Sequence, residues 1–182
     1  MSFLIESKLI DQLKKLNDEF GIKGIKAEFE AEGSSYDDIV RLRNLTGKID
    51  NMPLHVKIGE VEAIRDIIDC LEIGVDGIIA PMVESAFGAK KFVSAVEKLD
   101  VVDILHCSIN IETKNSLNEL QDILDVVRNA VDNITIGRSD LSASYMSESI
   151  APNSTFIAKQ SISIATSAKR NGYSSTMGGN VN

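Results

Sequence analysis

The chain has 182 residues, of which 43% are hydrophobic, so it is long enough to fold around a sizeable core and too apolar to be disordered. Its 27 acidic and 19 basic side chains give a formal net charge of −8. That charge argues against a nucleic-acid partner or an anionic membrane surface, because neither would attract the chain.

Nothing in the sequence predicts a membrane span or an export signal. There is no apolar run of about 18 residues, and the start of the chain, "MSFLIESKLIDQLKKL", places charges between its apolar residues. We therefore expect a cytoplasmic protein.

In chain order, a predicted helix that ends at a glycine and is followed by a short predicted strand recurs three times. It is visible in "LNDEFGIKGIKAEF", "CLEIGVDGIIAPMV" and "AKRNGYSSTMGG", where Gly21, Gly74 and Gly172 suit the left-handed position that ends a helix. These repeats predict αβ units. The expected strands lie near 24–30, 53–58, 77–82, 104–111, 132–137 and 173–177, and the expected helices lie near 5–19, 36–47, 60–73, 85–98, 115–130 and 154–170.

The expected strands appear continuously apolar, which is typical of a parallel sheet covered by helices. A doubly wound sheet or a (β/α) barrel would fit. The sequence contains neither GxGxxG after the first strand nor GxxxxGK[ST], which counts against dinucleotide or nucleotide binding and favours the barrel. About six strands are fewer than a closed barrel of this class needs. We therefore predict one domain over 1–182, a TIM-type barrel that is incomplete and truncated at its C-terminal end.

Two neighbouring strands each end at a carboxylate, in "INIET" and "ITIGRSD". Glu112 and Asp140 should lie close together, since adjacent strands are about 4.8 Å apart. Two such carboxylates repel unless a cation or a proton lies between them, and carboxylate oxygens suit Mg²⁺ or Mn²⁺. The alternative is that Glu112 and Asp140 cap the helices that follow them.

Other polar residues fall at the same strand ends. Lys57, with the helix expected to follow it, could stabilise an enolate or hold a substrate carboxylate, or it could pair with Glu28 or Glu30. Arg138 could hold a carboxylate or neutralise Asp140.

Two further kinds of residue fit structural roles better. Pro81 suits a strand end, where no ladder donor is needed. For His55 and His106, a buried and hydrogen-bonded role is favoured over catalysis.

The ordered strand-end motifs resemble those of the HpcH/HpaI aldolase and citrate lyase β-subunit family. The resemblance rests on "VKIGEVEAIRDIIDCLEIGVDGIIAPMVESAFGAKKF", "INIETKNSLNEL" and "ITIGRSDLSAS", and it covers about residue 22 to the end of the chain. It implies a barrel of the phosphoenolpyruvate/pyruvate type.

The resemblance also implies chemistry. Members cleave or form carbon-carbon bonds next to a 2-oxo acid or acyl-CoA unit, and Glu112 and Asp140 correspond to the ligands of a divalent metal, Mg²⁺ or Mn²⁺, that stabilises an enolate. Lys57, Arg138, Pro81 and Gly137 then become expected substrate-binding residues.

The chain departs from the family pattern at three places. Lys57 stands where aldolase members have Arg, and "EFEAEG" replaces a Glu-His pair, which leaves Glu28 or Glu30 as substitutes for the usual general acid or base. Arg138 stands where many relatives have Pro and would replace the absent strand Arg as the carboxylate clamp. Lys57, Glu28 and Arg138 are therefore the expected catalytic residues, and the pattern is closer to an uncharacterised aldolase-like branch.

Three functions follow as expectations. The first is a metal-dependent lyase acting on a small 2-oxo acid, and the second is a citrate-lyase-like enzyme acting on an acyl-CoA. The third is a degenerate barrel that binds a ligand or partner without catalysis. Exposed strand edges of an incomplete barrel also predict a homo-oligomer.

Overall fold

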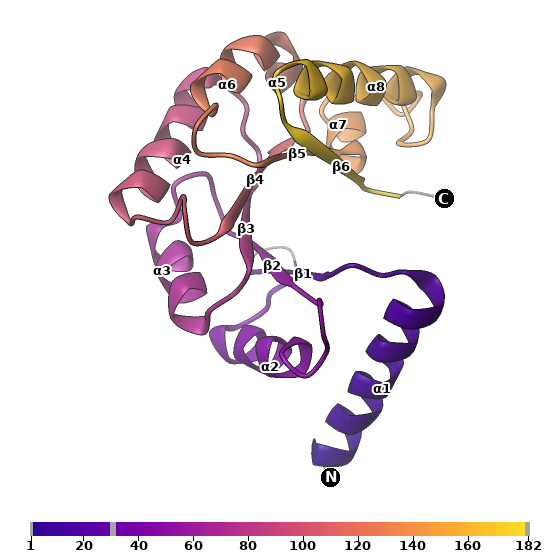
Figure 1. Ribbon diagram of the computed structural model, residues 1–182. Coiled ribbons are helices and arrows are strands. Elements are labelled where there is room, and N and C mark those ends of the chain that lie inside the picture. The colour runs from indigo at the N-terminus through magenta and orange to yellow at the C-terminus, as the bar shows by residue number, and fades with distance from the viewer. Residues whose placement is uncertain (1, 30–31, 181–182) are drawn as a thin grey trace.

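The computed structural model describes residues 2–29 and 32–180, and these form six αβ repeats in sequence order (Figure 1). The strands are β1 (Ile25–Glu28), β2 (Leu54–Lys57), β3 (Gly77–Ala80), β4 (His106–Ile111), β5 (Asn133–Gly137) and β6 (Ser174–Gly178). The helices are α1 (Ser2–Phe20), α2 (Tyr36–Thr46), α3 (Ile64–Ile73), α4 (Ala86–Lys98), α5 (Lys114–Asn118), α6 (Leu120–Val126), α7 (Arg138–Ala143) and α8 (Thr155–Arg170).

The strands form one parallel sheet in the order β1-β2-β3-β4-β5-β6. Figure 1 shows the sheet curving into an open arch, with α2, α3, α4, α6 and α8 along its convex side. Among the strands of the described chain, β1 and β6 are the two edges and do not pair with each other. The fold is therefore an incomplete α/β barrel, as the sequence predicts.

The helix-ending glycines behave as expected. Gly21, Gly74 and Gly172 have φ values of 72°, 72° and 89°, a left-handed conformation that glycine adopts without steric cost. At Gly74 the backbone N–H donates to the carbonyls of Cys70 and Leu71, which ends α3 and turns the chain into β3.

The boundaries differ from the prediction around three helices. The helix expected from residue 60 begins only at Ile64, after a turn, so its first-turn amides do not follow Lys57 directly. The helix expected over 115–130 is divided at Glu119, whose carboxylate accepts the backbone N–H of Ala86. The short helix α7 was not expected.

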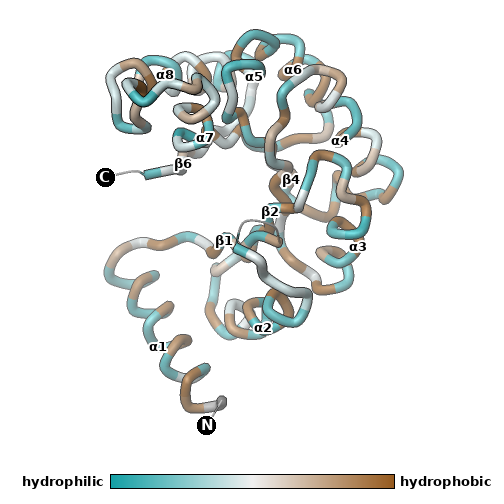
Figure 2. Tube along the Cα trace, turned by 180° about the vertical axis from the view of Figure 1, so that it is seen from behind, coloured by the Kyte–Doolittle hydropathy of each residue, from teal (hydrophilic) through white to brown (hydrophobic). Residues whose placement is uncertain are grey.

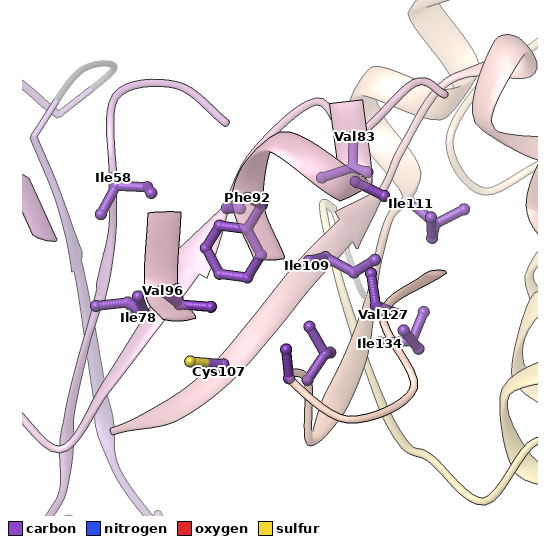
Figure 3. Packing of buried hydrophobic residues seen from close by; sticks show 14 of the residues in the cluster. Ile58, Ile78, Val83, Phe92, Val96, Cys107, Ile109, Ile111, Val127 and Ile134 are labelled. Carbon is purple, nitrogen blue, oxygen red and sulfur yellow. The ribbon is translucent and has the colours of Figure 1, made fainter. Parts of the chain in front are cut away.

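The hydrophobic core lies between the convex face of the sheet and the helices. Figure 3 shows Phe92 of α4 packing beside Ile78, Ile109 and Val96, all fully buried. Burial of each such side chain contributes about 1.5–3 kcal/mol, so this layer is the main source of stability.

The concave face of the sheet is polar, contrary to the expectation of continuously apolar strands. Strand residues alternate, so that Val56 and Ile109 face the helices while Lys57 and Asn110 face the inside of the arch. An incomplete barrel leaves this inner face open, which removes the need for apolar side chains there.

Helix α1 projects away from the arch and packs only against α2 among the elements with several shared contacts (Figures 1 and 2). One long ion pair, 3.9 Å between Arg41 Nη2 and Glu6 Oε1, joins the two helices. Leu4, Ile5, Leu9 and Phe20 of α1 remain exposed. Within residues 2–29 and 32–180, no helix combines the length and apolar character that crossing a membrane requires.

Candidate active site

The strand ends surround a cavity of about 330 Å³ at the carboxyl edge of the sheet. Its lining residues are Lys26, Glu28, Glu32, Lys57, Ile79, Asn110, Glu112, Thr135, Gly137, Ser139, Asp140, Gly178 and Gly179. Four of these side chains are carboxylates and two are lysines, so the lining carries an excess of negative charge. In parallel α/β folds ligands bind at this edge.

Glu112 is the most enclosed carboxylate of the cavity, with 3% of its surface exposed. Its Oε1 accepts the backbone N–H of Met82 at 2.9 Å, and its Oε2 accepts Asn110 Nδ2 at 3.0 Å. Burial raises the pKa of Glu112; these two hydrogen bonds oppose the shift, whereas the charge of Asp140 adds to it. A positive charge in the cavity would therefore stabilise the ionised form of Glu112.

The chain around Glu112 leaves its carboxylate free for the cavity. Thr113, and not Glu112, caps α5, since its hydroxyl accepts the N–H of Ser116. The expectation that Glu112 caps the helix is therefore wrong. Gly137 gives the carboxylate room, because a Cβ added at Gly137 would lie 2.7 Å from the Cβ of Glu112.

Asp140 reaches the same cavity from the next strand. It lies in the first turn of α7, directly after β5, so it does not cap that helix from outside as the alternative interpretation required. Its charge is one of the causes of the shifts at both Glu112 and Lys57. The two carboxylates predicted to share a site thus line one cavity and interact electrostatically.

A second group of charges lies on β1 and β2. Glu28 is 4% exposed, and its Oε2 contacts Lys26 Nζ at 2.7 Å and Lys57 Nζ at 2.9 Å. Burial alone would raise the pKa of Glu28, but the hydrogen bonds and charges of the two lysines lower it. The predicted pairing of Lys57 with Glu28 is present, and Glu30 lies outside the described residues.

Lys57 is held in its charged form. Burial opposes the charge, but the hydrogen bond from Lys57 to Glu28 and the charges of Glu28, Glu112 and Asp140 outweigh it and raise the pKa of Lys57. An ammonium group therefore faces the cavity beside the two carboxylates.

Arg138 and Pro81 do not line this cavity. Arg138 is buried, and its Nη2 donates to the carbonyl of Gly179 at 2.9 Å, which ties the start of α7 to the segment after β6. One donor of the guanidinium is thus used on Gly179, which itself lines the cavity, and no ion pair between Arg138 and Asp140 is present among the described residues; the role of Arg138 as a carboxylate clamp stays a prediction. Pro81 is buried directly before Met82, and its role in substrate binding stays a prediction.

The two residues that donate hydrogen bonds to Glu112, Asn110 and Met82, are not among the residues predicted from the sequence. Asn110 interrupts an apolar run two positions before Glu112, a spacing that places both on one face of the strand, so its polarity was an available signal. Its Oδ1 is buried without a hydrogen-bond partner. Met82 contributes through its backbone, which no residue pattern reveals.

The histidines lie at the opposite end of the strands. The rings of His55 and His106 are 5.2 Å apart, with Gly77 between them in the strand register, and neither lines the cavity of Glu112. His55 lines a second cavity of about 330 Å³ that opens between β1 and β6 and contains no carboxylate.

The donor set of the first cavity suits a hard divalent cation. Glu112 and Asp140 supply anionic oxygens, and the unpartnered Oδ1 of Asn110 is a further oxygen in the lining. No group of three or more His, Cys, Asp or Glu side chains within residues 2–29 and 32–180 converges on one point, so water and substrate would complete the coordination.

Comparison with known proteins gives one family. The family model of HpcH/HpaI aldolase/citrate lyase matches residues 50–178, which include Lys57, Glu112, Gly137 and Asp140. None of the curated proteins matches the chain.

Solved structures share the fold at low sequence identity. An HpcH/HpaI aldolase from Desulfitobacterium hafniense DCB-2 is 18% identical with a TM-score of 0.75, over 93% of this chain and 73% of the other. An HpcH/HpaI aldolase/citrate lyase family protein from Burkholderia cenocepacia J2315 is 14% identical with a TM-score of 0.74, over 92% and 75%. A citrate lyase from Burkholderia xenovorans LB400 is 12% identical with a TM-score of 0.67, over 93% and 60%.

Proposed function

The chain belongs to the HpcH/HpaI aldolase/citrate lyase family, and from that premise we propose that it is a carbon-carbon lyase that uses Mg²⁺ or Mn²⁺ and acts on a small 2-oxo acid. Family membership supports a lyase or aldolase type of activity. The observation that carries the metal dependence is the convergence of Glu112 and Asp140 on one cavity, where Glu112 is buried with no cationic side chain bonded to it.

In this proposal Glu112 and Asp140 hold the cation. When bound, the ion would supply Lewis-acid polarisation of the 2-oxo group. The ammonium group of Lys57 would bind the substrate carboxylate, since it is the less exposed of the two lysines that line the cavity. A lysine offers a point charge without the planar fork of arginine, so the carboxylate would be held by charge more than by geometry.

Glu28 would hold Lys57 in place and is the carboxylate nearest to its ammonium group. Because the neighbouring lysines lower the pKa of Glu28, it would be ionised near neutral pH and would keep Lys57 charged; the same shift makes Glu28 a weaker base than an ordinary carboxylate.

The direct test is a calorimetric titration with Mn²⁺ in the presence of pyruvate or oxalate. We expect saturable binding by the wild-type chain and its loss in Glu112→Gln and in Asp140→Asn, with unchanged circular dichroism. Binding that both variants retain would refute the metal assignment. Retention of full metal-dependent turnover by both variants would refute it as well.

Substrate assays would separate the alternatives. Cleavage within a panel of 4-hydroxy-2-oxo acids supports the proposal, whereas inhibition by CoA together with turnover of an acyl-CoA would favour a citrate-lyase type of reaction. A barrel without catalytic function would fail to exchange the methyl protons of pyruvate with solvent in the presence of Mn²⁺.

A further inference from the structure

Met82 has an unusual backbone conformation at the edge of the site. It follows Pro81 at the end of β3, and its φ is 50°, in the left-handed region that residues with a Cβ seldom occupy. The residue is 48% exposed, so packing of its side chain does not account for the conformation. Strain of this kind is common where a backbone group has a function.

The backbone N–H of Met82 is directed at the buried carboxylate. It donates to Glu112 Oε1 at 2.9 Å, while Asn110 Nδ2 donates to Oε2 at 3.0 Å. Each oxygen thus receives one hydrogen bond from protein, and Gly137 lies against the side chain. The φ angle of Met82 is the rotation about its N–Cα bond. It therefore sets the angle between this N–H and the chain that continues into α4.

We propose that Met82 is a positioning residue, whose left-handed backbone aims its N–H at Glu112 and fixes the orientation of that carboxylate in the cavity. Pro81 contributes by restricting the chain that leads into Met82. The inference rests on the proposed function only in so far as Glu112 is taken to hold a cation. Groups that hydrogen-bond to a metal-binding side chain typically change metal affinity by roughly 10- to 100-fold.

A purely structural alternative exists. The turn at Met82 also returns the chain to the core at Val83, which is fully buried. In that case substitutions at Met82 would change the stability of the protein and leave the orientation of Glu112 and the affinity for Mn²⁺ as they are.

The test replaces Met82 with residues of different backbone preference. Met82→Gly accepts a positive φ and keeps the N–H, Met82→Leu is the control for side-chain volume, and Met82→Pro removes the N–H and requires a negative φ. We expect Mn²⁺ affinity within about twofold of wild type for Met82→Gly, and a loss of roughly 10- to 100-fold for Met82→Pro.

Met146 offers a matched control. It too has a left-handed φ, 52°, and is exposed, but it follows α7 and its N–H donates to the carbonyl of Ala143, not to a carboxylate of the cavity. Met146→Pro should change thermal stability with no change in Mn²⁺ affinity. Equal affinities of the folded wild-type and Met82→Pro proteins would overturn the proposal.

A measurement without metal tests the positioning role of Met82 separately from the proposed metal-dependent function. In ¹⁵N-labelled protein, the amide proton of Met82 should be shifted downfield and protected from exchange, and Glu112→Gln should move it upfield, because a neutral acceptor makes a weaker bond than a carboxylate. An unprotected amide that Glu112→Gln leaves unchanged would overturn the positioning role. Failure of the wild type to bind Mn²⁺ would refute the proposed function, and the amide signal would still decide the role of Met82.

Discussion

The side chain of Glu112 occupies the space where Gly137 would carry a Cβ. A Cβ there would lie 2.7 Å from the Cβ of Glu112 and closer still to its Oε2, far inside normal contact. The end of β5 therefore accepts the carboxylate of β4 only because residue 137 is glycine. Gly137 thus has a steric role toward the carboxylate, and its role in substrate binding stays a prediction.

Gly137→Ala should displace Glu112 and weaken Mn²⁺ binding by about tenfold or more, the range found when groups that support a metal ligand are changed. The measurement is a calorimetric Mn²⁺ titration. Gly88→Ala is the control, because its Cβ would meet only Ser85 Oγ at 3.4 Å and it lies in α4, outside the cavity. An affinity of Gly137→Ala equal to that of Gly88→Ala would show that Glu112 tolerates the displacement.

Lys57→Met keeps most of the length of the side chain and removes its charge. We expect KM for the 2-oxo acid to rise roughly 10- to 100-fold, because a hydrogen bond to a charged group contributes about 1.5–3 kcal/mol. Lys91→Met is the matched control, since Lys91 also pairs with a glutamate at 2.9 Å, but with an exposed one, Glu62. Steady-state kinetics decide the matter, and an unchanged KM would remove Lys57 from the substrate site.

The stability of the protein should fall as pH decreases below the ordinary value of 6.5 for His55. Burial lowers the pKa of His55, and the charge of His106 adds to this effect while that of Asp76 opposes it. The unfolded chain therefore binds a proton at a higher pH than the folded chain does, so this contribution is present above pH 6.5 and is lost as the pH falls toward the folded pKa.

Urea unfolding between pH 7.5 and 5 would measure this effect. His55→Gln removes the titrating group and should flatten the dependence of the unfolding free energy on pH over this range. A slope as steep as that of the wild type would assign the pH dependence to other groups.

Among the described elements, α1 carries the greatest number of exposed large hydrophobic residues, namely Leu4, Ile5, Leu9 and Phe20. We expect these residues to be covered in a homo-oligomer, because such surfaces associate in water. Leu9→Glu should lower the mass measured by light scattering. Ile162→Glu, which changes a still more exposed apolar residue on α8 (66% against 46% for Leu9), should leave the mass unchanged, and a monomeric wild type would contradict the expectation.

The sequence was sufficient for the architecture because the relevant signals are local. Gly21, Gly74 and Gly172 end helices through their own backbone conformation, and the six strands lie within a few residues of their predicted positions. The character of the inner face was misjudged, although "LHVK" and "HCSINI" do alternate between apolar and polar residues. Apolar residues, chiefly isoleucine and valine, fill the alternate positions of these runs, so the runs are apolar by content although they alternate by position.

The site was predictable only in part, for a physical reason. Glu112 and Asp140 stand at the ends of consecutive strands, so chain order alone brings them together. The contacts of Glu112 with Met82 and of Arg138 with Gly179 join residues 30 and 41 positions apart through backbone groups. Backbone N–H and carbonyl groups are the same in every residue, so the sequence carries no direct sign of such contacts.

The polar inner face also fixes how the last three strands align. Asn133 Nδ2 lies within 3.1 Å of the hydroxyl oxygens of Ser108 on β4, Thr135 on β5 and Thr176 on β6. If β6 slid by one residue, Thr176 would turn toward α8, and Ser175 or Met177 would take its place on the inside. The amide of Asn133 thus favours the observed register of β6 over registers shifted by one residue. This matters because β6 is an edge strand that is largely exposed, so few buried apolar contacts specify its register.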